Sequence, residues 1–172
     1  SLLGGTNGWA ALPDRPVPDV PLDPDDDALI FYTSGTTGKP KGALNSQRNC
    51  CNGLLAHAFT GARNFLRRGE PIPAPDPKAP QRCTLLSVPF FHATGCLAVL
   101  FPTMVNGGRL VMMRRFEPEA AMQVIERERV TNCGGVPTIA WQLLEHPARH
   151  KYDLSSLEGV SYGGAPAASE LV

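Results

Sequence analysis

The chain has 172 residues, enough for one domain with a sizeable core or for part of a larger domain. Hydrophobic residues make up 42% and charged residues 19%, which is ordinary globular usage and excludes a disordered tail or a fibrous protein. Sixteen basic residues balance sixteen acidic ones without a basic stripe, so we expect no nucleic-acid partner.

The cysteines are odd in number and have no Cys-x-x-Cys spacing, which argues against a disulfide framework and a zinc site. We expect reduced, mostly buried thiols at Cys50, Cys51, Cys83, Cys96 and Cys133. No signal peptide begins the chain, and the longest apolar stretch, near residues 96–105, is too short to span a bilayer. The sequence therefore favours a cytoplasmic location without a transmembrane segment.

The first 27 residues are rich in Gly, Pro and Asp and predict a connecting segment with little regular structure. Residues 28–172 are then expected to form part of a ligand-binding domain. Ala28 to Tyr32 is a continuous apolar run, which predicts a strand buried on both faces. A short extended piece at residues 43–45 leads to Ser46, which is placed to cap a helix over residues 47–59.

Five prolines among the twelve residues from Gly69 to Pro80 predict an exposed loop. A buried strand is expected at 83–88, followed by one buried helix or two short ones at 93–104. The pattern continues with strands at 109–113, 130–133 and 160–162 and helices at 117–129 and 138–144. This alternation predicts an α/β fold with a largely parallel sheet and flanking helices, whose ligands gather at the carboxyl ends of the strands.

The segment with the most informative chemistry is Tyr32-Thr33-Ser34-Gly35-Thr36-Thr37-Gly38-Lys39-Pro40-Lys41-Gly42. Besides the tyrosine it holds four hydroxyl residues, three glycines and two of the four lysines in the chain. Glycines let backbone N–H groups turn toward phosphate oxygens, and hydroxyl and ammonium groups add donors and positive charge. The segment therefore predicts a loop that binds a polyphosphate.

A Walker A loop is the obvious alternative, but that motif needs four residues between its first glycine and its Gly-Lys-Ser/Thr ending. Here only two threonines separate Gly35 from Gly38. Pro40 also stands where the Walker motif needs a magnesium-binding hydroxyl. The spacing therefore disfavours a Walker-type NTPase.

The same residues closely resemble the signature of the adenylate-forming superfamily, which includes acyl-CoA synthetases, luciferases and peptide-synthetase adenylation domains. The resemblance implies part of the N-terminal domain of an acyl-CoA synthetase-like fold. It also implies a reaction in which a carboxylate attacks the α-phosphorus of ATP, pyrophosphate leaves, and coenzyme A takes the acyl group. The expected cofactors are ATP, coenzyme A as co-substrate, and Mg²⁺ held by residues outside this chain.

The resemblance assigns the loop to the β- and γ-phosphates of ATP. The phosphate-binding set is Thr33, Ser34, Gly35, Thr36, Thr37, Gly38, Lys39 and Lys41. Within it, Thr36 and Lys41 are the expected catalytic residues, because donors aimed at the departing pyrophosphate stabilise the transition state.

The segment Val88-Pro89-Phe90-Phe91-His92-Ala93-Thr94-Gly95 resembles a family segment that lies beside the reacting carboxylate. His92 is therefore an expected acyl-site residue and not a metal ligand, because no other histidine shows helical spacing with it. Amino-acid-activating relatives usually carry an Asp here, and a buried ammonium without a counter-ion is costly. A fatty or related acid without an α-amino group is the expected substrate.

Near the end of the chain, Gly163, Gly164, Ala165 and Pro166 resemble the family segment whose backbone lies along the adenine ring. Small residues permit that close approach. By the same resemblance, Val136 is an expected substrate-binding residue that controls acyl or thiol access.

The resemblance covers only the middle of the family's larger N-terminal domain, and segments expected to hold magnesium, the ribose and a catalytic lysine are absent. We therefore expect the isolated chain to be inactive. Two alternatives to an acyl-CoA ligase stay open: a module that loads an acyl carrier protein, and a non-catalytic nucleotide-binding relative.

Overall fold

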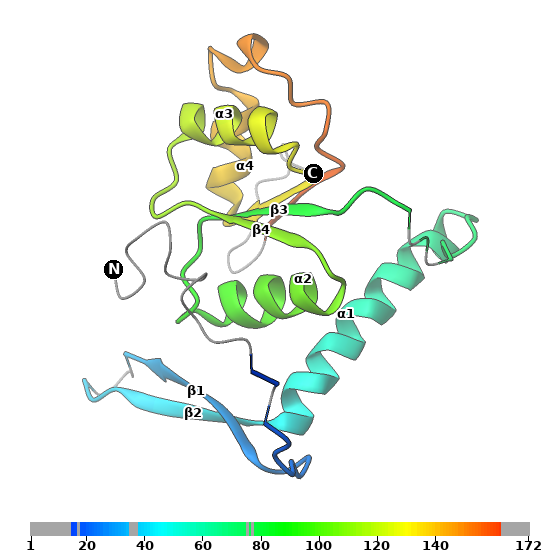
Figure 1. Cartoon of the computed structure of the whole chain (residues 1–172). Helices are drawn as coiled ribbons and strands as arrows, with labels where there is room; N and C mark the ends of the chain where they lie inside the picture. The colour runs from blue at the N-terminus through cyan, green and yellow to red at the C-terminus, as the bar shows by residue number, and fades with distance from the viewer. Residues whose placement is uncertain (1–14, 17, 35–37, 75, 77, 163–172) are drawn as a thin grey trace.

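The structure is a computed structural model that describes residues 15–16, 18–34, 38–74, 76 and 78–162. It consists of an antiparallel hairpin and a four-stranded parallel sheet with helices on both faces. A long helix, α1, runs from the hairpin toward the sheet (Figure 1). The predicted α/β fold is confirmed.

The hairpin pairs β1 (Asp27–Thr33) with β2 (Lys41–Ser46), and Ile30 faces Leu44 across the pair. The prediction of a strand buried on both faces is wrong, because Ile30 is 57% and Tyr32 72% exposed. Their neighbours Leu29 and Phe31 are half-buried, so one face of the strand is partly covered and the other is exposed. Side chains alternate between the faces of a strand, and only one face of β1 packs against the described chain.

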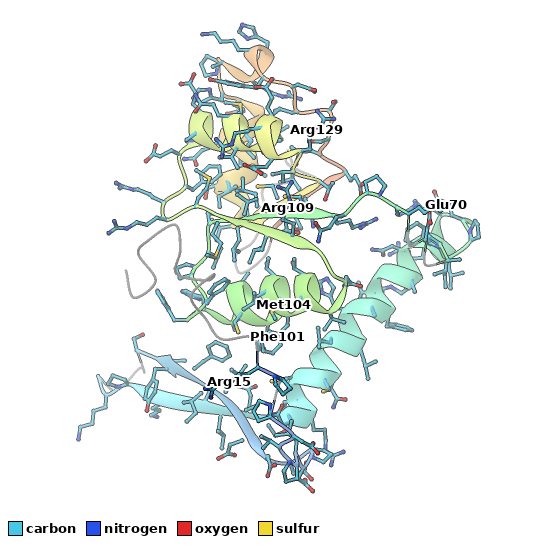
Figure 2. The ribbon with its side chains drawn as sticks, viewed as in Figure 1. Arg15, Glu70, Phe101, Met104, Arg109 and Arg129 are labelled. Carbon is cyan, nitrogen blue, oxygen red and sulfur yellow. The ribbon has the colours of Figure 1, made fainter. Side chains whose placement is uncertain are left out.

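Helix α1 (Gln47–Arg67) begins where the sequence predicts, because Ser46 Oγ accepts a 3.3 Å hydrogen bond from the Asn49 amide. Arg48 adds two hydrogen bonds of 2.8 and 2.9 Å to the carboxylate of Asp25. The helix runs eight residues beyond the predicted end at residue 59, because no proline interrupts it. Glu70, just after the helix, marks its far end (Figure 2).

The parallel sheet has the order β4-β3-β5-β6. Its strands are β3 (Cys83–Leu86), β4 (Arg109–Met112), β5 (Asn132–Gly135) and β6 (Gly159–Tyr162). The strand predicted at 130–133 begins and ends two residues before the observed β5. Val130 and Thr131 join α3 to the strand, and the Thr131 hydroxyl bonds both the amide and the carbonyl of Cys83 at 3.0 Å.

Helices cover both faces of the sheet (Figure 1). One side holds α3 (Pro118–Glu128) and α4 (Pro137–Leu144), and the other holds a π-helix (Thr94–Leu100) that continues into α2 (Phe101–Val105). A short 3₁₀ helix, Arg149–Lys151, follows α4. The helix predicted at 93–104 exists but is only partly buried: Gly95, Cys96 and Pro102 face inward, whereas Met104 is 67% exposed.

The main core lies between the sheet and the α3–α4 layer. Leu85 from β3, Met122 and Ile125 from α3, and Val130 are each at most 1% exposed. Burying one such side chain stabilises the fold by about 1.5–3 kcal/mol relative to leaving it in water. The loop at 69–80 is exposed wherever the structure describes it, as the prolines predict.

Candidate functional site

The predicted phosphate loop forms the turn between β1 and β2. Thr33 faces Lys41 in the hairpin register, and the Thr33 hydroxyl donates a 3.5 Å hydrogen bond to the Lys41 carbonyl. This pairing closes the base of the loop. Gly35, Thr36 and Thr37 at its centre lie outside the described residues.

The described part of the loop is open to solvent and carries two positive charges. Gly38 has a φ of +80°, a left-handed conformation that glycine adopts without strain. Ser34, Lys39 and Lys41 are exposed, and within the described segments neither ammonium group is in an ion pair. A turn of this kind presents hydroxyls and cations to an incoming anion.

His92 lies in a tight turn that leaves the carboxyl end of β3. Its amide donates a 3.1 Å hydrogen bond to the Pro89 carbonyl, and its own carbonyl accepts one of 3.0 Å from the Cys96 amide. The imidazole is exposed, with its ring centre 5.8 Å from that of Phe91. The turn therefore holds the backbone of His92 while its side chain stays accessible.

Two further predicted segments leave neighbouring strands of the sheet. Val136 follows β5, is 43% exposed, and occupies the position just before the first turn of α4. Gly135 pairs with Tyr162, the last residue of β6. The predicted adenine-binding residues follow directly in the sequence, but Gly163, Gly164, Ala165 and Pro166 lie outside the described residues.

The predicted site residues that the structure describes lie on one side of the molecule. Because the four strands are parallel, His92 and Val136 leave the sheet at the same, carboxyl edge. The end of β1 and the start of β2 lie on that side as well, with the π-helix and α2 between the hairpin and the sheet (Figure 1). This is the usual location for ligands in an open α/β sheet.

A pocket of about 480 Å³ opens at the carboxyl ends of β3 and β4. It is lined by Leu86, Ser87, Val88, Pro89, Phe90, Met112, Met113 and Arg114. Residues 112–114 were not among the predicted site residues. The signal that could have found them is their position directly at the end of a parallel strand.

A second pocket, of about 330 Å³, lies at the opposite, amino edge of the sheet beside the end of α1. Its two arginines already have carboxylate partners: Arg68 contacts Glu70 at 2.7 Å and Arg82 contacts Glu158 at 3.4 Å. This pocket therefore lies apart from the candidate site at the carboxyl edge of the sheet.

Three of the buried thiols are poor nucleophiles. All five are free and four are buried, as predicted, with Cys51 the exposed exception. Burial raises the pKa of Cys133 to about 11 and also raises the pKa values of Cys83 and Cys96. A buried thiol with a raised pKa holds little thiolate near neutral pH.

Within the described ranges, no group of three or more His, Cys, Asp or Glu side chains could hold a metal ion. None of the described helices combines the length and hydropathy that crossing a bilayer requires.

Comparison with known proteins identifies the family. The profile of the family described as AMP-binding enzyme matches residues 3–172. Because the match extends over nearly the whole chain, the chain belongs to the AMP-binding, adenylate-forming enzymes. The resemblance seen in the phosphate loop is thereby confirmed.

The chain is similar to coenzyme A ligases. It is 38% identical over 165 residues to a feruloyl-CoA synthase from Amycolatopsis sp, a match that covers 94% of this chain and 30% of that protein. It is 32% identical over 151 residues to the medium/long-chain-fatty-acid–CoA ligase FadD8 of Mycobacterium tuberculosis, covering 88% and 24%. The chain thus spans less than a third of the length of these relatives.

A solved structure gives the same fold. The N-terminal domain of FACL13 from Mycobacterium tuberculosis, solved with an inhibitor bound, superposes with a TM-score of 0.67 at 27% identity. The match covers 90% of this chain and 35% of that one. The parallel sheet and its helices therefore correspond to part of the N-terminal domain of an acyl-CoA synthetase.

Proposed function

We propose that the complete protein containing this chain activates a carboxylic acid with ATP and transfers the acyl group to coenzyme A. An oxygen of the carboxylate attacks the α-phosphorus of ATP, and the bond from that phosphorus to pyrophosphate breaks. The thiol of coenzyme A then loses its proton and attacks the acyl carbon, and AMP leaves with the electron pair of the acyl–oxygen bond. The observation that carries this proposal is the glycine, hydroxyl and lysine loop on the β1–β2 hairpin of a chain from this family.

The loop is proposed to act mainly in the first step. Negative charge builds on the departing pyrophosphate, and donors that already face it need no reorganisation. Thr33, Ser34, Gly38 and Lys39 are assigned to phosphate binding, and exposed Lys41 to neutralising the developing charge. Gly35, Thr36 and Thr37 complete the set by their place in the sequence, with Thr36 as a catalytic donor.

The acid and the adenine are assigned to the carboxyl edge of the sheet. His92 is proposed to lie beside the reacting carboxylate, because its exposed imidazole follows β3 at that edge. Val136 at the start of α4 is proposed to border the acyl or thiol path. Gly163, Gly164, Ala165 and Pro166 are proposed to lie along the adenine ring.

The proposed substrate is a fatty or related acid without an α-amino group. No acidic side chain stands at residues 88–95 to pair with a substrate ammonium, and burying an unpaired ammonium is costly. The names of the two relatives, feruloyl and medium/long-chain fatty acyl, agree with this class. Both relatives are also named for coenzyme A, which favours it over a carrier protein as acceptor.

Within the described segments, no three or more His, Cys, Asp or Glu side chains come together as a metal-binding group. We therefore propose that any Mg²⁺ accompanying ATP is held by the phosphates and by residues elsewhere in the protein.

The proposal is tested by acid-dependent exchange of labelled pyrophosphate into ATP, using the complete protein and a panel of fatty, aryl and α-amino acids. We expect exchange with fatty or aryl acids and none with α-amino acids. Adding coenzyme A should then yield the thioester, whereas an acyl carrier protein should not be loaded. Absence of exchange with every acid in a folded, ATP-binding protein would favour the non-catalytic alternative.

A further inference from the structure

Gly95 is packed so closely against the His92 turn that no side chain fits there. It is buried near the start of the π-helix. A Cβ atom on Gly95 would lie 2.8 Å from the Val88 carbonyl oxygen and 2.9 Å from the Pro89 carbonyl carbon, with the Pro89 oxygen nearer still. Cβ atoms are essentially never found within 3.0 Å of another atom, and these are backbone atoms that cannot rotate aside.

The backbone that Gly95 contacts is the same backbone that holds His92. The Pro89 carbonyl accepts the hydrogen bond from the His92 amide, and the His92 carbonyl accepts one from Cys96, the residue after Gly95. The turn and the first residues of the π-helix therefore form one hydrogen-bonded unit. Any displacement of Val88 and Pro89 from Gly95 must move His92 with them.

We propose that Gly95 is a positioning residue for His92, an inference that rests on the proposed function of the site. Its missing side chain lets the π-helix contact the carbonyls of the turn, and this contact sets where the exposed imidazole stands relative to the acid. Gly95 itself touches no substrate. A methyl group at position 95 pushes the turn at residues 88–92 away from the π-helix, and this movement displaces His92.

The kinetic test compares Gly95→Ala with Gly61→Ala in the complete protein. Gly61 lies in α1 and has no atom within 4 Å of a Cβ position, so the same substitution causes no overlap there. We expect Gly95→Ala to raise the KM for the acid about tenfold or more in pyrophosphate exchange, because small misplacements at a reacting group are costly. The KM for ATP should stay within about twofold for both variants.

A double-mutant cycle separates positioning from general damage. If Gly95 acts through His92, adding Gly95→Ala to His92→Ala should change the acid KM by less than about twofold, because the shared effect is already lost. Full additivity of the two substitutions would overturn the proposal. An unchanged acid KM in a folded Gly95→Ala protein would overturn it equally.

Hydrogen–deuterium exchange tests the geometry without activity. In the wild type, the amides of His92 and Cys96 should exchange slowly, and Gly95→Ala should speed exchange across residues 88–96 about tenfold while leaving α3 unchanged. The exchange rates can be measured even if no acid supports pyrophosphate exchange. A failure of the proposed function can therefore be distinguished from a failure of this proposal. Should Gly95→Ala fail to fold, fast exchange of both amides in the wild type would overturn the proposal, and slow exchange would support it.

Discussion

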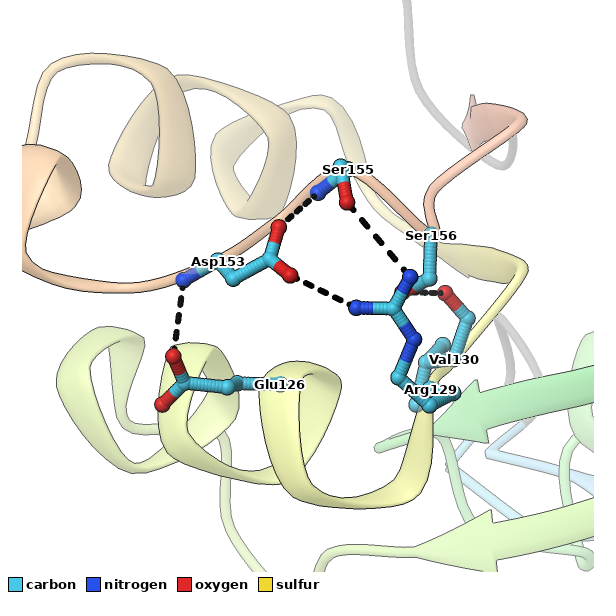
Figure 3. A network of polar contacts seen from close by, with 6 residues as sticks. All are labelled: Glu126, Arg129, Val130, Asp153, Ser155 and Ser156. Carbon is cyan, nitrogen blue, oxygen red and sulfur yellow. Dashed lines mark hydrogen bonds and ion pairs between the residues drawn. The ribbon is translucent and has the colours of Figure 1, made fainter.

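Arg129 Nη1 donates a 2.7 Å hydrogen bond to Asp153 Oδ2, which joins the end of α3 to the segment that precedes β6 (Figure 3). Arg129 has a φ of 50°, the left-handed conformation with which the helix ends. The other carboxylate oxygen of Asp153 accepts from the Ser155 amide at 2.9 Å, and Glu126 accepts from the Asp153 amide at 3.0 Å. These contacts hold the connection that carries the chain to the edge strand β6.

The carboxylate of Asp153 should make stability depend on acid pH. Hydrogen bonds from the Ser155 hydroxyl and amide, and then from Arg129, lower the pKa of Asp153 from 3.8 to about 2. Since the folded pKa lies below the unfolded one, the stabilisation is complete above about pH 4 and is lost as the pH falls toward 2. Asp153→Asn should weaken this acid dependence, as measured by urea unfolding followed by circular dichroism.

The matched control for Asp153 is Asp19→Asn, which changes a carboxylate in an exposed segment. Its unfolding free energy should follow the wild-type curve between about pH 2 and 5, because Asp19 lies outside the Asp153 contacts. If Asp153→Asn and the wild type lost stability identically across this range, the contacts of Asp153 would have no role in the acid transition.

Lys41 should be required for adenylation. Losing one preorganised donor to a developing oxyanion typically costs about 3–4 kcal/mol of transition-state stabilisation. Lys41→Ala and Thr36→Ala should therefore slow pyrophosphate exchange by about a hundredfold or more. Lys78→Ala, in the proline-rich loop, removes the same charge from an exposed site and should leave the rate unchanged. An unchanged rate in Lys41→Ala would refute its assignment.

The five thiols should differ sharply in reactivity. Cys51 is exposed, whereas burial raises the pKa values of Cys83, Cys96 and Cys133. Because the thiolate is the reactive form, iodoacetamide at pH 8 should modify Cys51 first in the folded protein. Peptide mass spectrometry reads out the site, and Cys51→Ser should abolish the fast phase. Rapid modification of Cys133 would contradict its burial.

Much of the fold could be predicted because its elements depend on local signals. Ser46 caps α1 at the predicted residue, and the apolar runs around Leu85 and Leu110 are strands. The exposure of Ile30 and Tyr32 could not be predicted, because an apolar run shows that a strand forms but not what covers each face. The bounds of β5 were predicted two residues too early because Gly134 and Gly135 weaken the strand pattern at its end.

The candidate site was only partly predictable. The loop around Gly38 and the turn at His92 were found from residue chemistry and from family resemblance. The relation in space between the His92 turn and Val136 depends on the parallel pairing of β3 and β5, which places segments from distant parts of the chain at one edge. The tight contact of Gly95 with Val88 depends on backbone geometry that no residue pattern displays.

A crystal structure of the complete protein with ATP bound would test the proposed role of the loop directly. We expect the β- and γ-phosphates to accept hydrogen bonds from the backbone amides and hydroxyls of residues 33–38, with the Lys41 ammonium within about 3 Å of a phosphate oxygen. A triphosphate bound elsewhere, with the loop between β1 and β2 empty, would contradict the proposed role of this loop and with it the proposed function.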